Sequence, residues 1–210
     1  MTSQFVHLHL HTDYSLVDGL VRIKPLVKAA AASGMPAIAI TDQHNLFAAV
    51  KLYSAAMQAG VKPILGADIR LRDSSDSKKS LRMVLLCSTM KGYHNLSRLI
   101  SRAYTEGQHL GVPMLEPEWL DGQTDGLICL SGGREGVLGR DLLGGRQTEA
   151  EQLARQWMQL FPDRFYLELV RTGRDDEERY IQQALQLASE LDLPVVATND
   201  VRFLRREDFE

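Results

Sequence analysis

Three histidines alternate with apolar residues near the start of the chain, in the segment VHLHLH at residues 6–11. In an extended strand, successive side chains point to opposite faces, so His7, His9 and His11 would line one face and the apolar residues the other. Neutral imidazoles are common ligands of transition metals. The spacing therefore favours a metal site over a solvated edge strand or a tag remnant, since tags usually carry consecutive histidines.

Carboxylates follow several of the apolar runs farther along the chain, at Asp18, Asp42, Asp68 and Asp200. In parallel α/β folds, functional side chains gather where strands end, so these carboxylates can meet the histidines in one pocket. Taken singly, each aspartate is better explained as a helix cap or a turn residue. Together with the histidines, they indicate a site for a divalent cation.

Short β-rich runs alternate with longer amphipathic stretches along the whole chain. The predicted strands span residues 5–11, 37–41, 63–69, 81–87, 126–131, 165–170 and 194–198. The predicted helices span residues 24–32, 46–59, 93–104, 149–160 and 176–191. This alternation predicts parallel strands, in an open sheet or a closed barrel, and we favour the barrel. The hydrophilic stretches 72–80 and 107–118 are expected to be loops.

The composition is that of an ordinary globular protein. Hydrophobic residues make up 44% of the 210 residues, and the formal net charge of −3 indicates no global affinity for nucleic acid. The chain has no long apolar run and no signal-peptide pattern at its start, so we expect a cytoplasmic protein without a membrane segment. Cys87 and Cys129 lie in apolar runs and are expected to be buried free thiols.

Several motifs, in order, resemble the polymerase-and-histidinol-phosphatase (PHP) family, in the version found in the alpha subunits of bacterial replicative DNA polymerases. The segment HLHLHTDYSLVDG resembles the first PHP motif, and ITDQHN, GAD and ATNDVRF resemble later ones. The stretches GYHNLSRLISRAY and FPDRFYLELVRTGRDDEE resemble the polymerase version. The likeness implies an α/β fold of the PHP type, a distorted seven-stranded (β/α) barrel. It also implies a PHP domain at residues 1–203, followed at 204–210 by the start of a linker to a polymerase body.

The resemblance further implies a metal centre, with up to three metals at nine ligand positions. The ligands of the first metal map onto His9, His11, Asp68 and Asp200, and the third metal retains Asp18 as a vestigial ligand. Zn²⁺ or Mn²⁺ would suit the first position, where two imidazoles and two carboxylates would fill the coordination sphere.

Four of the nine positions carry residues that cannot bind a metal: Gln43, Arg82, Gly133 and Arg202. A guanidinium has no lone pair to donate. We therefore predict that Arg82 replaces the charge of the second metal and Arg202 that of the third. His44, one residue from Gln43, is a weaker candidate for compensating its loss, because a one-residue shift at a strand end redirects the side chain.

These departures favour a structural role over hydrolysis. The resemblance implies a scaffold in a DNA-directed DNA polymerase, with the rest of the alpha subunit and the proofreading exonuclease subunit as partners, and with DNA bound through the full-length protein. The alternatives are a metal-dependent phosphoesterase similar to histidinol phosphatase and a 3′–5′ exonuclease on the same barrel. The resemblance also implies that the catalytic aspartates of the polymerase belong to later domains. This chain of 210 residues is therefore not expected to polymerise DNA by itself.

Overall fold

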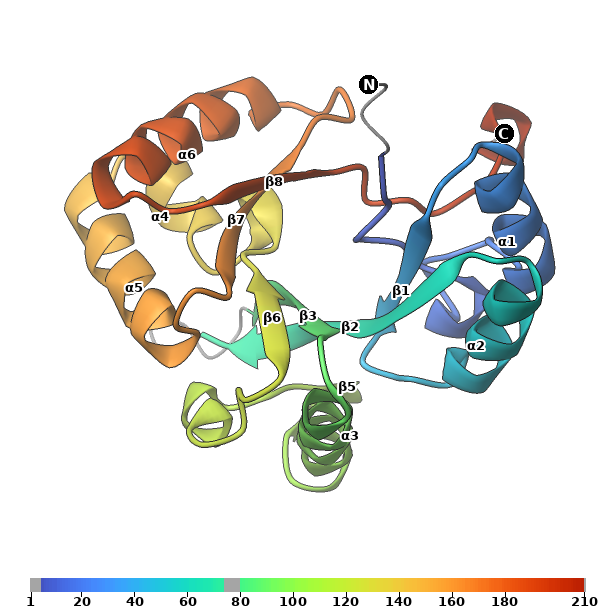
Figure 1. The fold of residues 1–210 in the computed structure, drawn as a ribbon. Coiled ribbons are helices and arrows are strands. Elements are labelled where there is room, and N and C mark those ends of the chain that lie inside the picture. The colour runs from blue at the N-terminus through green and yellow to red at the C-terminus, as the bar shows by residue number, and fades with distance from the viewer. Residues whose placement is uncertain (1–4, 74–79, 210) are drawn as a thin grey trace. The chain divides into compact units, whose positions relative to one another are not determined.

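The computed structural model describes residues 5–73 and 80–209, which divide into two compact units (Figure 1). The first unit comprises Met1–Asp68 and Asn199–Glu210, and the second comprises Ile69–Thr198. The first unit thus contains most of the predicted site: His9, His11, Asp18, Asp68, Asp200 and Arg202. Arg82 and Gly133 belong to the second unit.

Two parallel strands form the frame of the first unit. β1 (Ala37–Gln43) pairs with β2 (Lys62–Arg72) in a register that places Gln43 opposite Asp68. Both predicted strands are confirmed, and β1 extends beyond its expected end through Gln43. The parallel register brings the carboxyl end of β1 beside Asp68, in the middle of β2, where the candidate site lies.

Two amphipathic helices cover the apolar residues of this unit, as the sequence predicted. They are α1 (Ile23–Ala32) and α2 (Ala49–Gln58). Leu26 and Leu52 from these helices pack in one buried cluster with Leu10 and Ile40. Two short 3-10 helices complete the unit, η1 (Asp13–Ser15) and η4 (Arg206–Phe209).

The histidine segment is extended but is not the regular strand predicted for residues 5–11. Leu10 makes an isolated parallel bridge to Val201. The Thr41 N–H donates to the Leu10 carbonyl at 2.8 Å, and the His11 N–H donates to the Val201 carbonyl at 2.8 Å. The segment therefore has hydrogen-bonded backbone neighbours on both sides, although its bonds are too few and too irregular for a continuous ladder.

Four strands of the second unit come where the sequence predicted them: β3 (Ser80–Cys87), β6 (Leu127–Leu130), β7 (Phe165–Val170) and β8 (Val195–Thr198). β6, β7 and β8 are parallel, but β3 and β6 are antiparallel, which corrects the expectation of parallel strands throughout. Cys87 at the end of β3 lies opposite Leu127 at the start of β6. The chain between them therefore leaves and rejoins the sheet at the same edge, which reverses the strand direction.

The described strands form one six-stranded sheet and one two-stranded sheet. The six-stranded sheet has the order β1-β2-β3-β6-β7-β8. The fold is therefore mixed α/β, but the predicted seven-stranded barrel is not confirmed, because residues 5–11 contribute bridges rather than a seventh strand.

The helices of the second unit are α3 (Met90–Thr105), α4 (Gly139–Leu143), α5 (Gln147–Leu160) and α6 (Glu177–Leu191). The sequence did not predict α4, which has only five residues. The expected loop at 107–118 contains a hairpin of β4 (Gln108–His109) and β5 (Val112–Pro113), followed by η2 (Pro117–Leu120). Residues 74–79 of the other expected loop lie outside the described residues. A further 3-10 helix, η3 (Gly133–Glu135), follows β6.

Cys87 and Cys129 are both free, as predicted, with Cys129 buried and Cys87 only half-buried. Burial raises the pKa of the Cys87 thiol to about 12, so it is protonated and unreactive at neutral pH. None of the helices in the described part of the chain combines the length and the apolar character that a membrane crossing requires.

Candidate metal centre

The backbone of the histidine segment directs His9 and His11 to the same side. Leu10, between them, is completely buried in the apolar cluster of the first unit. Successive side chains of an extended segment alternate in direction, so the two imidazoles point away from this cluster. Both are nonetheless almost fully buried, with 2% and 0% of their surface exposed. A buried pair of imidazoles on one face is what the alternating sequence predicted.

Asp68, in the middle of β2, meets both imidazoles. Its Oδ2 lies 3.1 Å from Nε2 of His11 and 3.4 Å from Nε2 of His9. One potential ligand atom from each of these three residues lies within 4.8 Å of the other two. Two imidazole nitrogens and a carboxylate oxygen form a donor set that suits Zn²⁺ or Mn²⁺. The three residues therefore fit a metal ion.

Asp200 extends this group from the other end of the first unit's sequence. Its Oδ1 lies 3.5 Å from His9 Nε2, and its side chain is buried. The residue adopts a left-handed backbone conformation with φ of 45°, which aspartate tolerates better than most residues. The structure therefore gathers the four residues predicted for the first metal. Their role as ligands remains a prediction.

Asp18 and Arg202 form a second cluster beside His11. Arg202 Nη1 makes an ion pair with Asp18, and Arg202 Nη2 lies 3.0 Å from Asp200 Oδ2. The Gln43 side chain donates to Asp18 Oδ2 at 2.5 Å, and the same oxygen lies 3.6 Å from Nδ1 of His11. Arg202 thus bridges the two carboxylates, and its replacement of the third metal remains a prediction.

Burial sets the protonation of the groups in this site. It lowers the pKa of His11, and the hydrogen bond and negative charge of Asp68 oppose the effect only in part. The neutral imidazole favoured in this way is the form that binds a metal. Burial also lowers the pKa of Arg202, but a guanidinium remains protonated in proteins. Arg202 therefore supplies a permanent positive charge.

Two other histidines are not members of the group. His7 is only half-buried, and its Nδ1 has no hydrogen-bond partner among the residues that the structure describes. Its ring packs edge-on against Phe5, with 5.0 Å between the ring centroids, so the expectation of three convergent histidines is wrong for His7. The backbone N–H of His44 donates to the Asp68 carbonyl at 2.9 Å, while its side chain is outside the three-residue group.

Asp42 has a positioning role that the sequence did not reveal. This buried carboxylate accepts a hydrogen bond from the Thr12 N–H at 2.6 Å, from the Thr12 hydroxyl at 2.8 Å and from the Ser15 hydroxyl at 2.7 Å. Ser15 Oγ in turn accepts from the Gln43 N–H at 3.1 Å. Asp42 therefore ties the segment that leads to Asp18 to the end of β1. The only hint in the sequence was the pairing of threonine and serine just after the histidines.

The remaining two predicted positions lie in the second unit. Arg82, on β3, is buried, and its Nη1 lies 3.3 Å from Oε2 of Glu135. Gly133 has a left-handed conformation with φ of 64°, and a Cβ built there would lie 3.5 Å from the Val170 side chain. Gly133 offers no side chain to a metal, and the replacement of the second metal by Arg82 remains a prediction.

Comparison with known proteins gives two consistent results. A family model for the PHP domain matches residues 7–172. The DNA polymerase III subunit alpha of Pseudomonas aeruginosa is 52% identical over 210 residues, which is 100% of this chain and 18% of that protein. The same subunit of Escherichia coli K12 is 48% identical over 207 residues, 99% of this chain and 18% of that protein. The chain therefore spans less than one fifth of the length of these relatives.

Two solved structures share the fold at low sequence identity. A protein of Bifidobacterium adolescentis assigned as a metal-dependent phosphoesterase has a TM-score of 0.64 at 16% identity, over 96% of this chain and 88% of its own. An amidohydrolase of Chromobacterium violaceum, with bound sulfate and no metal, has a TM-score of 0.61 at 12% identity, over 94% of this chain and 87% of its own. The family model covers most of the chain, and the relatives match its whole length. The chain belongs to the PHP domain family.

Proposed function

We propose that this chain is the PHP domain of a bacterial replicative DNA polymerase alpha subunit, and that it acts as a scaffold rather than as a hydrolase. The observation that carries this proposal is the bridge that Arg202 forms between Asp18 and Asp200. A fixed guanidinium there lies between two carboxylates and offsets one of their two negative charges, which reduces their repulsion and the need for a further cation. Identity of 52% along the whole chain supports the assignment to the alpha subunit.

The remaining donors support a single divalent cation. His9, His11 and Asp68 would hold Zn²⁺ or Mn²⁺, with Asp200 as a fourth ligand. A metal at such a position supplies positive charge and Lewis acidity, but hydrolases with adjacent metals use one cation for the nucleophile and another for the leaving oxygen. With Arg202 in place of a further cation, the remaining site suits a structural ion.

Arg82 is proposed to replace the second metal in the same way. It is buried on β3 although it carries a permanent charge, and a buried charge needs compensation. The test is Arg82→His, which introduces a side chain that can bind a metal. The variant should bind more Mn²⁺ per chain than the wild type. An unchanged stoichiometry in a folded variant would contradict the proposed role.

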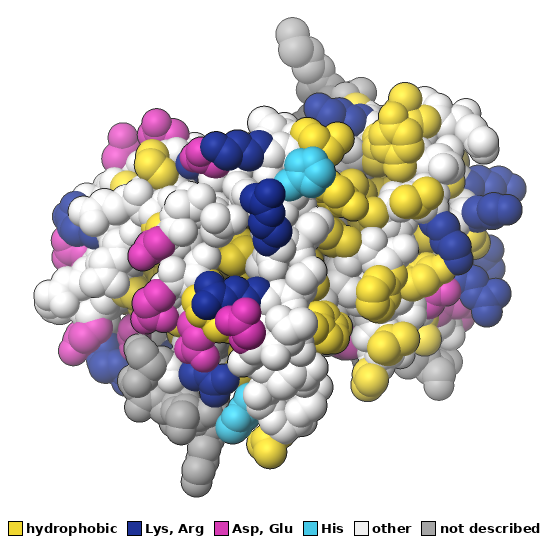
Figure 2. All heavy atoms as spheres, turned by 90° about the horizontal axis from the view of Figure 1, so that it is seen from below, with side chains coloured by type: hydrophobic (Ala, Val, Ile, Leu, Met, Phe, Trp, Pro, Cys, Tyr) yellow, Lys and Arg dark blue, Asp and Glu magenta, His cyan; other side chains and the backbone are white. Residues whose placement is uncertain are grey.

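Exposed apolar side chains support a scaffold role. Val50, Tyr53 and Met57 follow one another on the outer face of α2, and 76% of Val50 and 57% of Met57 is exposed. Figure 2 shows hydrophobic side chains gathered on part of one face of the molecule. Such patches often mark protein contacts. The proposed partners are the rest of the alpha subunit and the proofreading exonuclease subunit, in the cytoplasm, with DNA bound through the whole protein and residues 204–210 leading into the polymerase body.

Metal content and hydrolysis together test this proposal. The purified chain is loaded with Mn²⁺ or Zn²⁺, dialysed and analysed for metal per chain, then incubated with single-stranded DNA and with a generic phosphodiester. We expect one metal or none per chain and no turnover above that of His9→Ala. His94→Ala, a change at an exposed histidine of α3, is the matched control.

A residual phosphoesterase or 3′–5′ exonuclease is the alternative function. The three-donor group favours it, because such a group is the core of a hydrolytic metal site. A structural neighbour assigned as a metal-dependent phosphoesterase points the same way. Two or three metals per chain, with turnover that His9→Ala abolishes and His94→Ala preserves, would establish this alternative and overturn the scaffold proposal.

A further inference from the structure

Four arginines line a pocket of about 530 Å³ that lies wholly within the second unit. They are Arg70, Arg82, Arg134 and Arg140, and among the described residues of the lining Glu135 is the acidic one. The whole chain has a formal net charge of −3, so the pocket concentrates positive charge against the overall balance. Clustered positive charge of this kind attracts anions and raises their local concentration.

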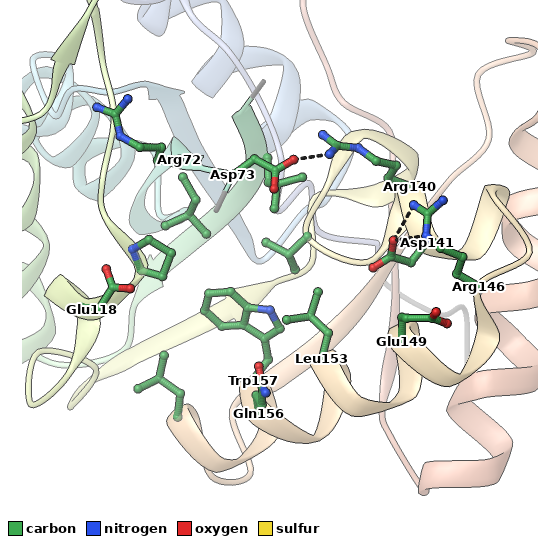
Figure 3. Close-up of a pocket in the computed structure, with 15 residues that line it drawn as sticks. Arg72, Asp73, Glu118, Arg140, Asp141, Arg146, Glu149, Leu153, Gln156 and Trp157 are labelled. Atoms are coloured by element: carbon green, nitrogen blue, oxygen red, sulfur yellow. Dashed lines mark hydrogen bonds and ion pairs between the residues drawn. The ribbon is translucent and has the colours of Figure 1, made fainter. Parts of the chain in front are cut away.

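The arginines come from four different elements, and most are held in place by polar contacts. Arg70, on β2, donates to the Ser80 hydroxyl at 2.9 Å. Arg134, on η3, donates to the Asp175 carbonyl at 3.2 Å. Arg140, on α4, points toward Asp73 and forms an ion pair with it (Figure 3). Guanidinium groups positioned in this way lose little further freedom when they bind a ligand.

Within the described part of the chain, the contacts of Glu135 with the cations around it are long. Its Oε2 lies 3.3 Å from Nη1 of Arg82, and its Oε1 lies 3.4 Å from Nη2 of Arg134. Charge-assisted hydrogen bonds are usually about 2.7–2.9 Å long. The Glu135 side chain is also 47% exposed, so it can move aside. Glu135 therefore offsets part of the positive charge of the pocket through contacts that are longer than usual.

We propose that this pocket binds a phosphoryl group, with Glu135 as an internal competitor for the same arginines. A phosphoryl group presents several oxygens in different directions, and guanidinium forks bind such oxygens in pairs. Arginines from four elements can approach this group from several sides, whereas the two oxygens of a carboxylate lie in one plane. The group can belong to free phosphate, to a nucleotide or to a nucleic acid backbone.

This site shares Arg82 with the position proposed for the second metal, but it is distinct from the predicted ligands of the first metal. None of its lining residues belongs to His9, His11, Asp68 and Asp200. Binding is therefore measured on the 210-residue chain with EDTA present, which removes any anion bound through a metal. Failure of the scaffold proposal, shown by metal-dependent turnover, leaves this measurement unaffected.

Isothermal titration calorimetry measures the binding of three probes to the chain: inorganic phosphate, a deoxynucleoside monophosphate and a short single-stranded oligonucleotide. The expected result is binding of all three with one site for phosphate, weakened roughly tenfold by Arg134→Gln, since a hydrogen bond to a charged group is lost. Glu135→Gln should bind phosphate several-fold more tightly, because it removes the competing carboxylate. The matched control is Arg155→Gln, which makes the same charge change at an exposed helical ion pair with Glu151 and should leave affinity unchanged.

The decisive outcome is that Glu135→Gln raises the affinity for phosphate whereas Arg134→Gln lowers it. If Glu135→Gln leaves phosphate affinity unchanged, or if Arg155→Gln weakens it as much as Arg134→Gln, attraction is a property of the whole surface and the pocket is not a site. Absence of phosphate binding in EDTA overturns the proposal as well. Circular dichroism of each variant establishes that it is folded, and Arg134→Lys, which keeps the charge, should recover part of the affinity.

Discussion

Arg202 makes an ion pair with Asp18, and its second terminal nitrogen lies 3.0 Å from Oδ2 of Asp200. One guanidinium therefore links two carboxylates that are far apart in the sequence, in the segment after the histidines and in the segment after β8. This relationship reduces the repulsion between Asp18 and Asp200 and keeps them close together. It also makes the stability of the first unit depend on one cation.

Arg202→Met should lower the free energy of unfolding by about 2 kcal/mol. This cost is smaller than that of removing one partner from a fully buried ion pair, because Arg202 is partly exposed. Urea denaturation in EDTA measures the change. Arg155→Met, at an exposed ion pair, is the control and should cost less than about 1 kcal/mol. Added Mn²⁺ should restore part of the stability of Arg202→Met. If the two variants lose equal stability, Arg202 does not replace a cation.

His11→Asn tests the three-donor group directly. The imidazole of His11 is completely buried and lies 3.1 Å from Asp68, so its loss leaves His9 and Asp68 as the donors of this group, with Asp200 as the further proposed ligand. We expect the metal bound per chain to fall below detection, and the thermal stabilisation by Zn²⁺ to disappear, since a bound ligand stabilises the folded state. His94→Asn should retain both properties of the wild type. Equal metal content in the two variants would place the metal elsewhere.

Asp42→Asn should lower the free energy of unfolding by about 2–3 kcal/mol, because three hydrogen bonds to a buried carboxylate are weakened or lost. Asp42 accepts from Thr12 and Ser15, so the amide would also present a donor to groups that donate. Chemical denaturation measures the loss, and Asp125→Asn, at an exposed pair with Lys91, is the matched control. A cost below about 1 kcal/mol would show that Asp42 does not hold the Asp18 segment.

The sequence predicted the elements well because their signals are local. All five predicted helices and six of seven strands are present, since apolar periodicity and turn residues lie within each element. The direction of the strands is instead a non-local property. Whether β3 and β6 run parallel depends on where the intervening chain rejoins the sheet, and no local pattern encodes that. α4 was missed because five residues carry too little periodicity.

The site was predicted in the same uneven way. The sequence allowed the convergence of four residues to be predicted, because the alternation of side chains and the ends of strands can be recognised in it. These residues are His9, His11, Asp68 and Asp200. Alternation also suggested His7. It determines only the direction in which a side chain points, however, and not whether the chain two residues before His9 is still close enough to the site. The hydrogen bonds of Asp42 depend on backbone conformations around Thr12 that residue types do not specify.

Glu177 offers a test of electrostatics in the second unit. It is the first residue of α6, and its carboxylate accepts from the backbone N–H groups of Thr172 at 2.6 Å, Gly173 at 2.8 Å and Arg174 at 3.2 Å. Burial by itself would raise the pKa of Glu177, but these hydrogen bonds, together with one from the Thr172 hydroxyl, outweigh it and lower the pKa below its usual value of 4.5.

A lowered pKa means that the unfolded chain takes up a proton at Glu177 before the folded chain does. The stabilisation is therefore fully present above pH 4.5 and is lost as the pH falls through the lower pKa of the folded state. Glu177→Gln should be less stable than the wild type by about 1–3 kcal/mol at pH 6.5, and the difference should shrink steadily toward pH 3.5. Urea denaturation at several pH values measures this difference, with the exposed Glu151→Gln as control. A difference that stays constant with pH would mean that the N–H groups do not discriminate between the charged and the neutral carboxyl.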